Sequence, residues 1–331
     1  MFLRELINRI KHKLKSSCQS LLFSMGVPYK FFLSNEKNVI LMYHGVCEKI
    51  NPFNSRHCYL SNFEKQIRYL KRCSNIISVE DFFDSRFDPN QSNVAITFDD
   101  GYKNNLSHAL PILEKYNVKA SVYITGLAKS EEKIIWADLL QMVCYFRKKD
   151  FVLQGETYSI ENRIAIRKSD KKSLLNIIKD EKPEYYVKQE LFNQLLHDFI
   201  QIRDKYREQW ELLTDNEIIK LSSSPLITIG SHAMQHNNLG NIEPETAINE
   251  IKISQKYLEN LTQKPVSEIA FPDGSYSHYL LQYCSEIGLS RQLISEQFKL
   301  PEDRGYSNLK TRYGIYQSGN WSEQIIPRLI R

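Results

Sequence analysis

Short apolar runs alternate with amphipathic helical patterns along most of the chain, and this alternation limits the folds that the chain can adopt. Helices are predicted at Leu106–Tyr116, Glu245–Leu261 and Tyr279–Ile287. A helix between two strands returns the chain to the starting end of a sheet, so that the strands run parallel. The pattern predicts an α/β fold with a parallel sheet, open or closed into a barrel. The predicted strands are Val39–Tyr43, Ile76–Val79, Val94–Phe98, Ser121–Ile124, Leu226–Ile229, Val266–Phe271, Gln292–Ile294 and Thr311–Tyr316.

One interval interrupts the alternation. About a hundred residues separate the strand that ends at Ile124 from the next predicted strand, and most of them follow helical patterns. The segment Phe151–Ile160 has the pattern of a hairpin, and Thr214 with Glu217 forms a capping box that starts a helix back towards the sheet. We therefore expect a helical insertion at about residues 130–222, within a barrel domain that spans residues 36–331. This insertion either packs on one face of the barrel or shapes a cleft there.

A basic arm, residues 1–35, precedes the alternating region. Leu3, Ile7, Ile10 and Leu14 fall at helical spacing, which predicts an amphipathic helix. Residues 1–33 contain six basic side chains and one acidic side chain, so they account for the whole net charge of +5. The neutral remainder argues against nucleic acid as a partner. Three placements of the arm stay open: on an anionic membrane surface, packed on the barrel, or docked on a partner protein.

The cysteines indicate a reducing compartment. Six of them are scattered along the chain without a C-x-x-C pair, which fits reduced thiols better than disulfides or a cysteine zinc site. The short apolar stretch Leu21–Val27 lacks the pattern of a secretory signal, and no run approaches the roughly 18 to 20 apolar residues that cross a bilayer. We expect a cytoplasmic protein, with peripheral contact to the inner membrane if the arm binds lipid.

Two adjacent carboxylates follow the predicted strand Val94–Phe98. The strand stops at Asp99 and Asp100, and Gly101 allows the backbone to turn so that both acids can face one pocket. Paired carboxylates repel each other unless a cation offsets them, in which case one acid binds the cation and the other stays ionised as a base. The alternative is an Asp-Asp-Gly turn with a solvated helix cap.

Two histidines follow the predicted strand Leu226–Ile229. His232 and His236 are four residues apart, which predicts that both imidazoles lie on one side of a helical turn and share a metal ion. Such a pair also occurs as surface or capping residues. The acid pair and the histidine pair support each other, because both lie just beyond strands on the same face of a barrel. Two imidazoles and one carboxylate leave positions open for water and a substrate oxygen, which is typical of a catalytic metal site.

The two motifs resemble those of a known family. T-F-D-D-G at residues 97–101 and S-H-x-x-x-H at residues 231–236 are similar to the first two motifs of the NodB-homology polysaccharide deacetylases, carbohydrate esterase family 4. The resemblance implies a distorted (β/α) barrel and metal-dependent removal of N-acetyl groups from amino sugars. It also implies Asp99 as general base and Asp100, His232 and His236 as the metal ligands. Their nitrogen and oxygen donors favour one divalent ion of the zinc type.

Two positions depart from the pattern of this family. Ala270 stands where the third motif has an arginine that steadies the base, and Ser295 stands where the last motif has a histidine that acts as an acid. A branch related to the poly-N-acetylglucosamine deacetylases instead has a Tyr-His motif on the first strand, and this chain has Tyr43-His44 there. The resemblance therefore implies His44 as the acid that protonates the departing amine. The alternative is a histidine that hydrogen-bonds the loop after the first strand.

The sequence as a whole predicts a metal-dependent carbohydrate N-deacetylase that acts on a surface polysaccharide or its precursor. Its partner would be an N-acetylated carbohydrate. The alternative function is a non-catalytic carbohydrate-binding barrel that keeps the metal site and has lost turnover, because both departures remove groups that serve the reaction.

Overall fold

The computed structural model describes residues 38–49, 52–53, 56–130, 133–181, 184–295 and 298–316. The basic arm of residues 1–35 lies outside these ranges, so its helix and its membrane contact stay predictions from the sequence. Among the described helices, none has both the length and the hydrophobicity that a membrane span requires.

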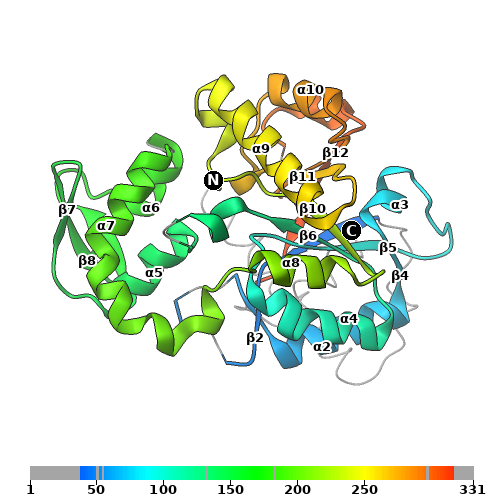
Figure 1. Ribbon diagram of the computed structural model, residues 1–331, viewed down its shortest axis with the longest axis horizontal. Coiled ribbons are helices and arrows are strands. Elements are labelled where there is room, and N and C mark those ends of the chain that lie inside the picture. The colour runs from blue at the N-terminus through cyan, green and yellow to red at the C-terminus, as the bar shows by residue number, and fades with distance from the viewer. Residues whose placement is uncertain are drawn as a thin grey trace, which may run out of the picture.

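The central sheet is a nearly closed parallel barrel (Figure 1). Its strand order is β13, β12, β11, β10, β6, β5, β1 and β14, with β4 paired to the side of β5. Every residue of β1, β5 and β6 is buried, as expected where helices cover the outside and side chains fill the inside. The predicted barrel is therefore confirmed. Its strands are β1 (Val39–Tyr43), β4 (Asn75–Ile77), β5 (Asn93–Phe98), β6 (Ala120–Ile124), β10 (Ile227–Ser231), β11 (Glu268–Ala270), β12 (Arg291–Ile294), β13 (Leu309–Thr311) and β14 (Tyr313–Gly314).

The seam of the barrel lies at Arg312. This residue alone separates β13, which pairs with β12, from β14, which pairs with β1 at the opposite end of the strand order. The backbone N–H of Arg312 donates to Ile294 on one side at 3.1 Å, and that of Ile315 donates to Met42 on the other at 2.9 Å. The prediction of a single strand at Thr311–Tyr316 is wrong, because the chain crosses from one edge of the sheet to the other within that run.

Helices cover the outside of the barrel (Figure 1). The predicted capping box is present at the start of α8, where the Thr214 N–H donates to Glu217 at 3.0 Å. The N-cap of α2 is Tyr59, because a small sheet of β2 (Val46–Cys47) and β3 (Cys58–Tyr59) leads directly into that helix. The helices are α2 (Leu60–Cys73), α3 (Val79–Phe83), α4 (Leu110–Tyr116), α8 (Asp215–Ser222), α9 (Pro244–Thr262) and α10 (His278–Glu286).

The segment between β6 and α8 forms a lobe beside the barrel, drawn in green in Figure 1. It has a hydrophobic cluster of its own, in which Leu140 of α5 and Leu191 and Leu195 of α7 are buried. The predicted hairpin is present as β7 and β8, and β9 extends it to a three-stranded antiparallel sheet that the helical patterns did not reveal. We call this lobe the insertion. Its elements are α5 (Trp136–Phe146), β7 (Phe151–Leu153), β8 (Glu156–Glu161), β9 (Ile164–Arg167), α6 (Leu174–Asn176) and α7 (Tyr185–Ile202).

Candidate active site

The two adjacent carboxylates lie at the carboxyl end of β5, as predicted. The Asp99 N–H donates to Tyr43 of the neighbouring β1 at 3.0 Å, which extends the strand pairing by one residue. The chain then turns sharply, with φ of 74° at Asp100 and 75° at Gly101. Glycine adopts this left-handed region freely and aspartate tolerates it better than most residues. The turn leaves both carboxylates buried, with Asp99 3% and Asp100 1% exposed.

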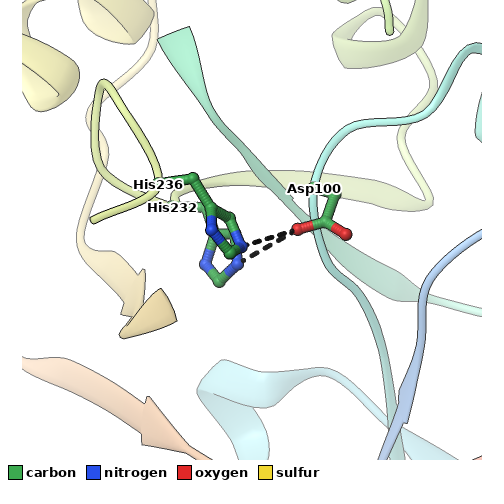
Figure 2. Close-up of side chains that lie close together, drawn as sticks. All are labelled: Asp100, His232 and His236. Atoms are coloured by element: carbon green, nitrogen blue, oxygen red, sulfur yellow. Dashed lines mark ion pairs between the residues drawn. The ribbon is translucent and has the colours of Figure 1, made fainter. Parts of the chain in front are cut away.

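The histidine pair reaches Asp100 from the end of β10 (Figure 2). The Nε2 atoms of His232 and His236 lie 3.4 and 3.2 Å from Asp100 Oδ1. Residues 232–236 form a loop and not the predicted helical turn, with φ of 60° at Ala233 and 51° at His236. The three side chains are nevertheless brought together as the sequence suggested.

This cluster fits a divalent ion. Two ligand atoms at about 2.0 to 2.2 Å from a tetrahedral ion lie about 3.3 to 3.6 Å apart, close to the separations of Asp100 from both imidazoles. His232 Nδ1 lies 2.7 Å from the Ala270 carbonyl oxygen, a contact that fixes the ring with Nε2 free to bind a metal. Both Asp100 oxygens are buried, and in the described part of the chain neither meets a donor at hydrogen-bonding geometry. A bound cation would compensate this charge.

Asp99 has a different partner, which the sequence did not predict. Arg312 Nη1 donates to Asp99 Oδ1 at 2.5 Å and Nη2 donates to Oδ2 at 2.7 Å, a bidentate pair. Arg312 is 1% exposed and lies at the barrel seam. It thus contacts the acid that the arginine of the family's third motif would steady, where this chain has Ala270. The sequence contained one weak signal, a charged residue inside a strand-like run.

Several strands hold the Arg312 guanidinium in place. Its Nη1 also donates to Thr97 Oγ1 at 3.2 Å, and its Nε donates to the Ile294 carbonyl oxygen at 3.3 Å. The Tyr123 ring packs beside the guanidinium, with 5.4 Å between the Arg312 Cζ atom and the ring centroid. Burial alone would raise the pKa of Asp99, but Arg312 and His232 more than offset burial and lower that pKa. Asp99 is therefore ionised at neutral pH.

His44 lies at the end of β1 and lines the same cavity as the acids. Its side-chain Nδ1 is buried and has no hydrogen-bond partner among the described residues, while its carbonyl oxygen accepts a bond from Asn105 at 2.7 Å. Burial is the main cause that lowers the pKa of His44 to about 4, and Arg56 adds to it. The imidazole is therefore neutral at pH 7 before any substrate charge develops.

The cavity has a volume of about 300 Å³, which lies at the lower end of the range for small-molecule binding sites. Barrel and insertion both contribute to its walls. Ser295, which replaces the family's late histidine, lines this cavity without providing an acid. The other lining residues include Met42, Arg56, Phe271, Asp273 and Tyr316 from the barrel, and Ala137, Gln141, Leu175 and Lys179 from the insertion.

The insertion also holds the loop that carries His236. Lys188 of α7 donates to the His236 carbonyl oxygen at 2.9 Å and to Asn237 Oδ1 at 2.6 Å. Glu250 of α9 accepts from the Gln235 N–H at 3.0 Å on the same loop. Lys188 is 4% exposed, and burial lowers its pKa to about 8. These contacts fix the loop conformation that points the histidine at Asp100.

A parallel barrel that gathers an acid pair and an H-x-x-x-H pair at one end of its strands defines the class of NodB-homology barrels. The model of the family described as polysaccharide deacetylase matches residues 87–163 and 195–291, and the stretch between the two matches lies in the insertion. The chain belongs to the polysaccharide deacetylase family. The resemblance seen in the sequence is thereby confirmed.

The individual proteins that resemble this chain have low sequence identity to it or match only part of it. YxkH of Bacillus subtilis (strain 168) is 32% identical over 97 residues, which are 26% of this chain and 31% of YxkH, so the match spans about a third of that relative. The deacetylase PplD of Streptococcus pyogenes, solved in complex with acetate, superposes with a TM-score of 0.57 at 17% identity, over 89% of this chain and 98% of PplD. IcaB from Ammonifex degensii superposes with a TM-score of 0.53 at 13% identity, over 90% of this chain and 98% of IcaB. These structures share the fold of this chain.

Proposed function

We propose that the protein is a metal-dependent hydrolase that removes N-acetyl groups from an amino sugar, in a polysaccharide or its precursor. The observation that carries the proposal is that two adjacent carboxylates in one cavity have different partners. Asp99 is ionised and clamped by Arg312, while Asp100 faces two imidazoles. Membership of the polysaccharide deacetylase family supports the substrate class.

Asp100, His232 and His236 would hold the divalent ion, and their donor set favours zinc. Such an ion supplies Lewis acidity, which polarises the acetyl carbonyl group and makes water easier to deprotonate. Two other side chains of the cavity, Asp99 and His44, would perform the proton transfers.

Asp99 is suited to act as the general base. Its two oxygens together offer about four acceptor sites, of which Arg312 takes two, so the carboxylate can still accept a proton from water. Water adds to the acetyl carbon and the C–N bond breaks, which yields acetate and a free amine. The departing nitrogen must gain a proton, because an amide anion is a very poor leaving group.

His44 is the proposed donor of that proton. Its pKa of about 4 in the free site means that it must be protonated during the reaction, when negative charge develops on the substrate beside it. His44→Ala should slow hydrolysis of an N-acetyl amide by about 10² or more and slow an activated acetate ester far less, because the ester's leaving group needs little protonation. Hydrolysis rates of wild type and variant, measured on both substrates, would check this. Equal losses on the two substrates, or no loss on either, would contradict the assignment of His44 as the proton donor.

The experiment that tests the proposed function is acetate release. Protein loaded with Zn²⁺ should release acetate from N-acetylhexosamine oligomers or glycoconjugates, lose this activity on treatment with a chelator and regain it when the ion is restored. If a broad substrate panel yields no acetate while the ion is bound, the protein is the non-catalytic carbohydrate-binding barrel. Ala270 and Ser295 favour that second function, whereas the clamp of Arg312 on Asp99 favours turnover.

A further inference from the structure

A second arginine lies beside the proposed metal ligands. Arg56 lines the cavity with 21% of its side chain exposed, and its Nη1 lies 3.7 Å from Asp100 Oδ2. Its Nη2 donates to Asp138 Oδ1 at 2.6 Å. The first separation is too long for a hydrogen bond, and the second is a short, charge-assisted one. Arg56 is therefore held by Asp138 within reach of Asp100.

Asp138 belongs to α5 of the insertion and is 2% exposed. Its second oxygen, Oδ2, accepts a hydrogen bond from the hydroxyl group of Tyr102, which is itself fully buried and follows Gly101. Both carboxylate oxygens of Asp138 thus have donors, one from each side. Asp138 is fixed in place, and it fixes Arg56 in turn.

Two buried carboxylates, Asp99 and Asp100, line the cavity, and a third, Asp138, contacts the lining residue Arg56. The three carboxylates differ in their cations. Arg312 is paired with Asp99 and Arg56 with Asp138, whereas no arginine or lysine of the described residues lies within hydrogen-bonding distance of Asp100. A guanidinium and a divalent ion compete for the same carboxylate oxygens. Asp100 can serve as a ligand because the nearest guanidinium is bound elsewhere.

We propose that Asp138 is a positioning residue that keeps Arg56 off Asp100 and so leaves this carboxylate available to a divalent ion. This inference rests on the metal site of the proposed function. Without the negative charge of Asp138, Arg56 would close the gap of 3.7 Å and form a hydrogen-bonded ion pair with Asp100. The insertion therefore contributes to metal affinity through one side chain, in addition to lining the cavity.

The test is a double-mutant cycle on Zn²⁺ affinity, measured on the full-length protein by competition with a chromophoric chelator. Asp138→Asn should weaken binding by about 10- to 100-fold, the usual effect of losing a group that orients a ligand. Arg56→Met should bind as tightly as the wild type or more tightly, because the competing charge is gone. The double variant should bind within about twofold of Arg56→Met. A role of Asp138 in packing alone would leave the double variant as weak as Asp138→Asn.

A matched control lies elsewhere in the insertion, where Asp198 of α7 pairs with Arg147 at the end of α5. Asp198→Asn removes the same kind of ion pair and should leave Zn²⁺ affinity unchanged. Unaltered affinity in Asp138→Asn, or no recovery in the double variant, would overturn the inference. If Asp138→Asn does not fold, weaker binding by Arg56→Met would overturn it equally. A wild-type protein that binds no Zn²⁺ would reject the metal site itself, which is a distinguishable result.

Discussion

Replacing both His232 and His236 by alanine is expected to remove the bound ion and acetate release together. Each imidazole presents Nε2 to the same oxygen of Asp100, and one carboxylate cannot retain a divalent ion against water by itself. Because such an ion stabilises the transition state by several kcal/mol, the rate should fall by about 10³-fold or more. Metal content by mass spectrometry and acetate release on the same samples would check both effects.

Asp99→Asn is the control for this variant. It changes the neighbouring carboxylate and leaves the three proposed metal ligands intact, so the ion should stay at one per chain while the rate falls by about 10² to 10⁴, the range for loss of a general base. A full equivalent of ion in the double histidine variant would show that these side chains are not the site. Loss of the ion in Asp99→Asn would show that the two acids cannot be assigned separate roles.

Arg312→Met should shift the acid limb of the pH–rate profile to higher pH. As the proposed base, Asp99 works only when ionised, so activity is expected above the pKa of Asp99 and should be lost as pH falls through it. Arg312 lowers this pKa, and its removal raises the pH at which activity is lost. Arg312→Lys, which keeps the charge but not the bidentate geometry, should place the limb between the two.

The same substitution is expected to lower the free energy of unfolding by about 3 to 5 kcal/mol at neutral pH, because a buried charge loses its partner. An Asp99 pKa below its unfolded value stabilises the fold above that value, so the difference between wild type and variant should shrink as pH falls. Denaturant titrations at neutral and acid pH would measure this. An unchanged acid limb together with unchanged stability would contradict the role of Arg312.

The sequence predicted the features that depend on local patterns. The runs that became β1, β5 and β6 are continuous and apolar, and parallel pairing places their carboxyl ends together, which is why Asp99, Asp100 and His232 could be grouped in advance. The motifs themselves carried the resemblance to the polysaccharide deacetylase family.

The features that the sequence could not predict depend on contacts between distant segments, above all on the closure of the barrel. Arg312 is 213 residues from Asp99 along the chain, and its role depends on a crossing between sheet edges that no periodicity encodes. Arg56 and Asp138 come from a loop and from the insertion, and neither belongs to a motif. The helical turn expected for the histidine pair was wrong because two left-handed residues, Ala233 and His236, shape a loop there instead.

The seam at Arg312 also has a consequence in time. The ribosome makes the chain from its N-terminus, so β13, Arg312 and β14 emerge after every other strand of the barrel. Until they arrive, β1 and β12 are open edges and Asp99 has no guanidinium beside it. Arg312, which completes the sheet, is also the residue that lowers the pKa of Asp99, the proposed base. In a nascent chain the proposed metal ligands Asp100, His232 and His236 are therefore made before Arg312, so Asp99, the proposed base, gains its guanidinium partner last.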